Sequence, residues 1–134
     1  MQDKLFIISS PNYPNLSGNI SIHDLQGHTW VTREKGSSTR KYLKHFICSN
    51  GLKVKSLLTI NSNQGVKESV VNGIGIFLLS HSVIERELKH GELSIVRLED
   101  QSFMRTFSYV YSPIMKSKRS VETFINVIRS KWPF

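Results

Sequence analysis

The sequence predicts an α/β fold in one domain, or in part of one. Short apolar segments typical of strands alternate with amphipathic segments typical of helices, which is the pattern of a sheet covered by helices. Residues 74–79 are almost all apolar, as expected of a strand that is buried on both faces. Residues 120–131 carry apolar side chains at helical spacing, which predicts one buried helix face. This order of elements indicates a mixed or parallel sheet.

The boundaries of these elements follow from the residues that stop them. Pro11 ends the first strand, and residues 11–27 form a loop with at most a short helical turn near 23–25. Glycines at positions 51, 73 and 91 end three helices. In chain order we expect strand 4–10, strand 29–33, helix 38–50, strand 53–61, helix 63–72, strand 74–79, helix 80–90, strands 93–98 and 106–112, and helix 120–131.

Each predicted helix has an apolar face that should be buried. The expected buried residues are Leu43, Phe46 and Ile47, then Val66, Val70 and Val71, then Val83, Ile84 and Leu88, and finally Val121, Phe124, Ile125, Ile128 and Trp132.

The composition suits a folded protein of the cytoplasm. Hydrophobic residues make up 39% of the 134 residues, which is enough for a core. The net charge is +8, but the cations are scattered, so they indicate solvated surface rather than a nucleic-acid site. No apolar run could cross a membrane, and the start does not resemble a signal peptide. Cys48 is alone, and we expect it to be a small buried hydrophobe on its helix.

Two predicted helices begin with small polar residues directly after a strand. The first start offers Ser37, Ser38, Thr39 and Arg40, and the second offers Ser62 and Asn63. Free backbone N–H groups and the positive end of each helix dipole would point at one spot and favour a small anion. Ser and Asn are also common helix caps, so capping alone is the competing interpretation at each start.

The residues for catalysis or metal binding are poorly placed. The five histidines have no metal-ligand spacing, and no nucleophile or metalloprotease motif is present. Gly73-Ile74-Gly75 lies between a helix and a strand, the wrong order for a dinucleotide site. Glu85 and Glu87 point in different directions on their helix, so we expect both at the surface. The alternating Phe103, Phe107, Tyr109 and Tyr111 favour strand packing over base stacking. We expect no enzyme activity, no catalytic residues, no metal and no cofactor.

Several segments, in their order and spacing, resemble the effector-binding domain of LysR-type transcriptional regulators. The resemblance extends from Leu5 to Trp132. The segments that carry it are Arg33-Glu34, Gly36-Ser37-Ser38-Thr39-Arg40, Ser62-Asn63, Val70-Val71-Asn72-Gly73-Ile74-Gly75-Ile76, Leu79-Ser80, Glu87-Leu88, Gly91-Glu92-Leu93 and Phe124-Ile125.

This resemblance implies a fold like that of type 2 periplasmic binding proteins, in which two α/β subdomains joined by two crossover strands enclose a ligand. Residues 1–105 then correspond to effector-binding subdomain two. Residues 106–134 correspond to a crossover strand and the C-terminal helix of an incomplete subdomain one. The sequence holds no winged helix-turn-helix, so we expect Met1 to mark a truncation and DNA to be bound only through the missing N-terminal domain.

The resemblance also implies the function and the ligand-facing residues. The function is effector sensing, with a small anionic metabolite bound between helix starts to control DNA binding. Ser37, Ser38, Thr39, Ser62 and Asn63 would face the ligand, and the backbone of residues 73–75, including Gly75, is a further candidate.

Two other functions are compatible with this fold. A solute-binding protein of the same fold would take a small anion and should carry a secretion signal, whereas an enzyme built on the fold should show a catalytic acid, base or cofactor lysine.

The C-terminal tail leads to a prediction about assembly. The segment 106–112 and the helix 120–131 would lack their partner strands. We therefore expect self-association through this tail, as a dimer or larger.

Overall fold

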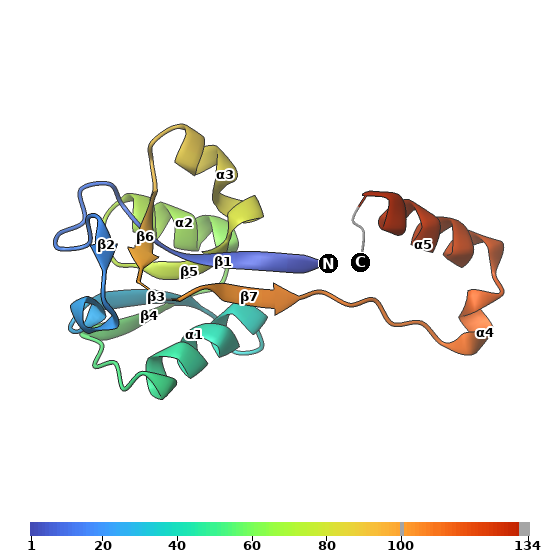
Figure 1. Ribbon diagram of the computed structural model, residues 1–134, viewed down its shortest axis with the longest axis horizontal. Helices are drawn as coiled ribbons and strands as arrows, with labels where there is room; N and C mark the ends of the chain where they lie inside the picture. The colour runs from blue at the N-terminus through green and yellow to red at the C-terminus, as the bar shows by residue number, and fades with distance from the viewer. Residues whose placement is uncertain (100, 132–134) are drawn as a thin grey trace. The chain divides into compact units, whose positions relative to one another are not determined.

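The computed structural model describes residues 1–99 and 101–131, which divide into two compact units. The larger unit is Lys4–Phe103, and the smaller unit is Met1–Asp3 with Met104–Phe134. The elements, drawn in Figure 1, are β1 (Gln2–Ser9), β2 (Asn19–Ile20), the 3₁₀ helix η1 (Ile22–Leu25), β3 (Thr29–Arg33), α1 (Ser38–Ser49), β4 (Ser56–Ile60), α2 (Asn63–Val71), β5 (Phe77–Ser80), α3 (His81–Lys89), β6 (Ser94–Leu98), β7 (Phe103–Thr106), α4 (Pro113–Lys116) and α5 (Arg119–Lys131).

The strands of the larger unit form a mixed sheet, as predicted. One part has the order β2-β6-β1-β5, in which β1 runs antiparallel to both β5 and β6, and β7 also pairs with β1. The other part is the parallel pair of β3 and β4. A parallel bridge between Trp30 and Ile76 joins the two parts, because Ile76 directly precedes β5. Figure 1 shows α1 on one side of the β3–β4 pair and α2 and α3 on the other.

The core lies between these strands and helices. Trp30 and Phe77 are its largest fully buried side chains. Trp30 packs against Phe46 of α1, with 6.3 Å between ring centroids, and Phe46 meets Phe103 edge to face at 4.9 Å. The strand expected at residues 74–79 is shorter and shifted: β5 spans Phe77–Ser80 and is buried along its whole length, whereas Ile74 precedes it and is 50% exposed.

Three helix faces are buried much as predicted. Leu43 and Phe46 are buried on α1, Val66 and Val70 on α2, and Ile84 on α3, whereas Ile47, Val71, Val83 and Leu88 are partly buried against the core.

The predicted strand 106–112 is wrong. The strand β7 spans Phe103–Thr106, and its neighbours 107–112 have no strand assignment. Alternating aromatic residues are a local signal, but a strand also needs a neighbour that takes its backbone hydrogen bonds. Instead, the rings of Tyr109 and Tyr111 stack on each other, with centroids 6.0 Å apart.

Two expected burial states are also wrong. Cys48 is exposed rather than buried, because it lies two residues beyond Phe46, about 200° further around α1. Glu87 is buried, with only 5% of its surface exposed, although it was expected at the surface with Glu85. Lys67 of α2 accounts for this burial, since its ammonium group lies 2.7 Å from a Glu87 carboxylate oxygen.

The smaller unit has its own polar and apolar contacts. Arg105 pairs with the buried carboxylate of Asp3 at 2.6 Å, and its guanidinium group lies over the ring of Phe107. On α5, Ile125 is buried but Phe124 is 64% exposed. The predicted apolar face of this helix also included Trp132, which lies outside the described residues.

Candidate functional site

The predicted site lies where β3 and β4 end. These parallel strands pair from Thr29 with Ser56 to Arg33 with Ile60, so their carboxyl ends meet at one edge. Each strand then leads into a helix, α1 after β3 and α2 after β4. The two helix starts are therefore brought to the same edge of the sheet, where α/β proteins commonly bind ligands.

The start of α1 is shaped by a capped turn. Gly36 has a positive φ of +98°, a conformation that favours glycine, and Ser37 is the N-cap. The Ser37 hydroxyl oxygen accepts a hydrogen bond from the backbone N–H of Arg40 at 3.4 Å. Ser38 is exposed and Thr39 is partly buried in the first turn of the helix. The capping interpretation is thus correct for Ser37.

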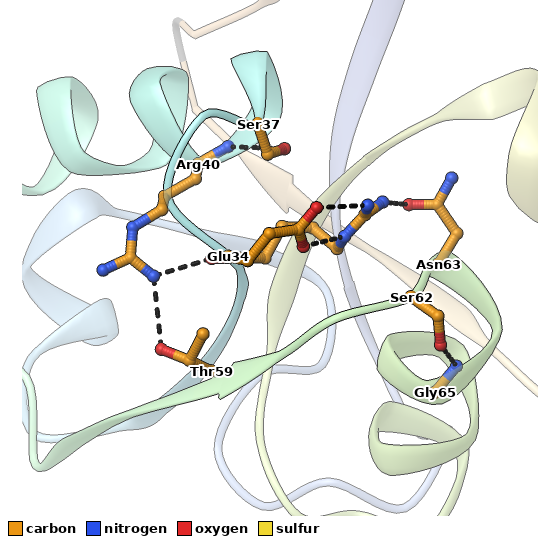
Figure 2. A network of polar contacts seen from close by, with 8 residues as sticks. Glu34, Ser37, Arg40, Thr59, Ser62, Asn63 and Gly65 are labelled. Atoms are coloured by element: carbon orange, nitrogen blue, oxygen red, sulfur yellow. Dashed lines mark hydrogen bonds and ion pairs between the residues drawn. The ribbon is translucent and has the colours of Figure 1, made fainter.

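The side chain of Arg40 lies across the ends of the two strands. Its Nη1 donates to the backbone carbonyl of Arg33 at 2.6 Å and to the hydroxyl of Thr59 on β4 at 3.2 Å. Figure 2 shows this guanidinium group between the α1 turn and β4. Arg40 therefore joins the strand ends together and adds positive charge beside the helix start.

The start of α2 is capped in the same way. The Ser62 hydroxyl accepts from the backbone N–H of Gly65 at 3.0 Å. Gly65 packs so closely that an added Cβ would lie 2.8 Å from the Ile60 side chain, which keeps the first turn of α2 tight against the end of β4. Asn63, the first residue of α2, accepts a hydrogen bond through its side-chain oxygen from Nη1 of Arg33.

Arg33 is the residue that connects the two helix starts, and the site prediction did not include it. Its Nε and Nη2 donate to the two carboxylate oxygens of Glu34, at 2.8 and 2.9 Å. Figure 2 shows the Glu34 carboxylate in the middle of this network, between Ser37 and Asn63. The signal in the sequence is the Arg-Glu pair at the end of the predicted strand, one of the segments that carry the family resemblance.

The Arg33–Glu34 pair also shifts the acid–base properties of both groups. The hydrogen bonds to Glu34 raise the pKa of Arg33 above its ordinary value. The pKa of Glu34 is lowered, first by the hydrogen bonds from Arg33 and then by a backbone hydrogen bond, with smaller contributions from the charges of Arg33 and Arg40. Both side chains are therefore charged near neutral pH.

Gly75 does not lie with the other predicted site residues. It meets the backbone of Thr29, at the amino end of β3, so it is separated from Arg33 by the length of that strand, about 13 Å at 3.3 Å per residue. A Cβ at position 75 would lie only 2.6 Å from the carbonyl oxygen of Thr29. Close packing between β3 and the segment that directly precedes β5 explains why this position is a glycine.

A cavity of about 410 Å³ in the larger unit lies elsewhere and was not predicted. It is lined by residues of β1 and β6 and their flanks, namely Lys4, Leu5, Phe6, Ile7, Asn19, Ile95, Val96, Arg97, Leu98, Gln101, Ser102 and Phe103. Across residues 1–99 and 101–131, no group of three or more His, Cys, Asp or Glu side chains could hold a metal ion. None of the described helices is long and apolar enough to span a membrane.

The comparison with protein families gives a match over nearly the whole chain. The LysR substrate binding domain family matches residues 1–133. CysL, an HTH-type transcriptional regulator of Bacillus subtilis (strain 168), is 48% identical over 134 residues, which are 98% of this chain and 44% of CysL. The uncharacterized HTH-type transcriptional regulator YeiE of Escherichia coli (strain K12) is 31% identical over 106 residues, which are 79% of this chain and 36% of YeiE. The chain thus spans less than half the length of these relatives.

Solved structures of low sequence identity share the fold. The regulatory domain of CcmR from Synechocystis PCC6803, in complex with 2-PG, has a TM-score of 0.77 and 23% identity, and the match covers 99% of this chain and 64% of that one. The effector-binding domain of QuiR, in complex with shikimate, has a TM-score of 0.67 and 13% identity over 98% of this chain and 63% of that one. The predicted α/β fold of the type 2 periplasmic-binding-protein kind is therefore confirmed. The named relatives are transcriptional regulators rather than enzymes, and the family match together with the identity to CysL shows that this chain belongs to the LysR substrate-binding domain family.

Proposed function

We propose that this chain is the effector-sensing domain of a LysR-type regulator and that its effector is a small anionic metabolite bound at the starts of α1 and α2. The observation that supports this proposal most directly is that two capped helix starts and two arginines lie at one edge of the β3–β4 pair. Helix N-termini present backbone donors and partial positive charge to an anion, and guanidinium groups add directed donors.

The relatives support a small ligand of this kind. CcmR was solved with 2-PG, QuiR with shikimate and HypT of Salmonella typhimurium with a bromide ion. In the proposed function, effector binding changes DNA binding by a winged helix-turn-helix elsewhere in the whole regulator, and the protein acts in the cytoplasm. These properties of the whole protein are proposals, because this chain corresponds to less than half of its relatives.

A titration followed by NMR tests the proposed site. We expect sulfate and inorganic phosphate, added to the ¹⁵N-labelled chain, to shift the backbone amide signals of Ser38, Thr39 and Asn63 in a saturable way. The amide of Gly51, just beyond the other end of α1, serves as the control because the helix dipole is negative there. Equal, non-saturating shifts at Gly51 and Ser38 would show a general salt effect and would contradict the proposal.

A further inference from the structure

The Arg33 guanidinium group already binds an anion in this structure, namely the carboxylate of Glu34. Two nearly parallel hydrogen bonds, of 2.8 and 2.9 Å, join its Nε and Nη2 to the two oxygens of Glu34. This two-pronged arrangement is the one by which arginine holds carboxylates and phosphates. Glu34 therefore occupies the donor edge that a small oxyanion would use.

The two partners of this ion pair are held to different degrees. Arg33 is the last residue of β3, its side chain is 19% exposed, and its remaining nitrogen donates to Asn63 of α2. The Glu34 side chain is 39% exposed and belongs to the turn between β3 and α1. The arginine is thus anchored to β3 and α2, whereas the glutamate is the more exposed partner and is held by Arg33 and by a backbone hydrogen bond.

Charge also favours an exchange at this position. The pair is partly exposed, and ion pairs of this kind contribute little to stability, so displacing Glu34 costs little. The Arg40 side chain is close by, because it donates to the backbone carbonyl of Arg33. Once Glu34 has turned away, an incoming oxyanion meets two guanidinium groups and the donors of the helix starts.

We propose that Arg33 is the specificity-determining side chain of the effector site and that Glu34 is its built-in competitor, which a small oxyanion displaces on binding. The inference rests on the proposed function, since it concerns the same site. It selects ligands with two adjacent acceptor oxygens on one group, such as a carboxylate, sulfate or phosphate, over a single-atom anion such as a halide.

The test uses sulfate binding to the 134-residue chain and four variants, followed by the amide signals of Ser38 and Asn63 and by the side-chain Nε–H signal of Arg33. Glu34→Gln removes the competing charge, and we expect sulfate to bind about fivefold more tightly. This factor is the upper limit that the stability of an exposed ion pair sets on the cost of displacing Glu34. Glu34→Asp keeps the charge but shortens the side chain. We expect it also to bind sulfate more tightly than the parent chain, because it cannot reach both nitrogens equally well.

Two further variants separate the role of Arg33 from charge alone. Arg33→Lys keeps the charge without the two-pronged donor edge, and we expect sulfate affinity to fall about tenfold or more while the fold is retained. Glu68→Gln removes a negative charge further along α2, where Glu68 bonds to Gln64, and serves as the control for general electrostatics. We expect its sulfate affinity to stay within about twofold of the parent value, because Glu68 is exposed and salt screens its charge.

The outcomes distinguish this inference from the proposed function. If sulfate shifts Ser38 and Asn63 in the parent chain but Glu34→Gln binds no more tightly, or the Arg33 Nε–H signal does not move, the competitor role is wrong and the anion site remains. If Glu68→Gln tightens binding as much as Glu34→Gln, only net charge matters and the competitor role is again wrong. If neither the parent chain nor Glu34→Gln binds sulfate at the helix starts, both proposals fail.

Discussion

At the scale of single residues, the buried ion pair of Lys67 and Glu87 joins α2 to α3. The nitrogen–oxygen distance is 2.7 Å, and only 14% of the Lys67 side chain and 7% of the Glu87 side chain are exposed. The second carboxylate oxygen of Glu87 is buried without a hydrogen-bond partner among the described residues. The carboxylate therefore depends on Lys67 for most of its compensation.

Replacing Lys67 should destabilise the fold markedly. The variant Lys67→Met keeps most of the unbranched apolar part of the side chain but leaves a buried carboxylate without its partner. We expect the free energy of unfolding, measured with urea, to fall by about 3 kcal/mol. The matched control is Lys89→Met, which breaks the exposed pair of Lys89 and Glu85 and should cost about 0.5 kcal/mol or less. Equal losses in the two variants would show that the buried pair has no special role.

The same pair gives the stability a defined dependence on pH. The pKa of Glu87 is lowered from its ordinary value of 4.5, mainly by the hydrogen bond from Lys67 and against the opposing effect of burial. A carboxyl group with a lowered folded-state pKa stabilises the fold at pH values above its unfolded-state pKa, and this contribution is lost as the pH falls through the folded-state value.

We therefore expect the stability difference between the parent chain and Lys67→Met to be largest near neutral pH and to shrink as the pH falls, because burial without Lys67 raises the pKa of Glu87 in the variant and its carboxylate is protonated before that of the parent chain. Urea unfolding at several pH values measures it, and subtracting the variant removes the contributions of the other carboxylates. A difference that grows on acidification would contradict this assignment.

At the scale of elements, the sequence predicts a helix or strand correctly where its structure depends on local residue patterns. The helices near 38–50, 63–72, 80–90 and 120–131 all exist within one or two residues of their expected limits, because apolar spacing and stop residues are local signals. The short helix α4 and the two-residue strand β2 were not expected, since neither is long enough to show a period. The strand 106–112 failed because its existence depends on a distant partner.

In the candidate site, too, some residues can be predicted from local patterns and others depend on contacts between distant segments. Ser37 and Ser62 could be located from the sequence because each follows a strand and precedes an apolar helix, and the structure places both as N-caps. The contact between Arg33 and Asn63 could not be foreseen, because it depends on the parallel register that brings Arg33 opposite Ile60. The family resemblance makes Gly75 a further ligand-facing candidate, but its contact with Thr29 places it at the amino end of β3, away from Arg33.

The close contact between β3 and the segment before β5 leads to a prediction about Gly75. A methyl group at this position would lie 2.6 Å from the backbone oxygen of Thr29, so Gly75→Ala must push the two segments apart. We expect it to lower the unfolding free energy by about 2 kcal/mol, as overpacking does, and to leave sulfate affinity unchanged. Gly27→Ala is the control, since Gly27 has a positive φ but open space around its Cβ position, and we expect a loss of about 1 kcal/mol there. A selective loss of sulfate binding in Gly75→Ala would instead place this residue in the site.

At the scale of the whole molecule, the smaller unit exposes several large apolar side chains. Val110 is 95% exposed, Ile114 80% and Phe124 64%. Beside them lies a cavity of about 430 Å³ lined mainly by apolar residues of the segment 109–112, α4 and α5, which are Tyr109, Val110, Tyr111, Ser112, Met115, Val121, Phe124, Ile125 and Ile128. Burying a large apolar side chain stabilises an association by roughly 1.5–3 kcal/mol.

A second copy of the chain is the occupant that we expect for this surface. Two copies related by a twofold axis would cover the same patch on each other, and this closed arrangement is the commonest way for a protein to self-associate. The net charge of +8 opposes association at low ionic strength, so the measurement belongs at about 0.15 M salt, where charges more than about 8 Å apart are screened. We expect light scattering with size-exclusion chromatography to report a dimer or larger species.

Two variants then locate the interface. Phe124→Glu places a charge in the middle of the apolar surface and should shift the chain toward monomer, as should deletion from Ser112 onward. Asn126→Glu adds the same charge at an exposed position of α5 that does not line the cavity, and it should leave the dimer intact. Because Phe124 is already mostly exposed, its replacement removes little packing within one chain, so a change in mass would report on the contact between copies. A parent chain that stays monomeric at millimolar concentration, or a dimer that survives Phe124→Glu, would show that α5 is not the surface through which the copies meet.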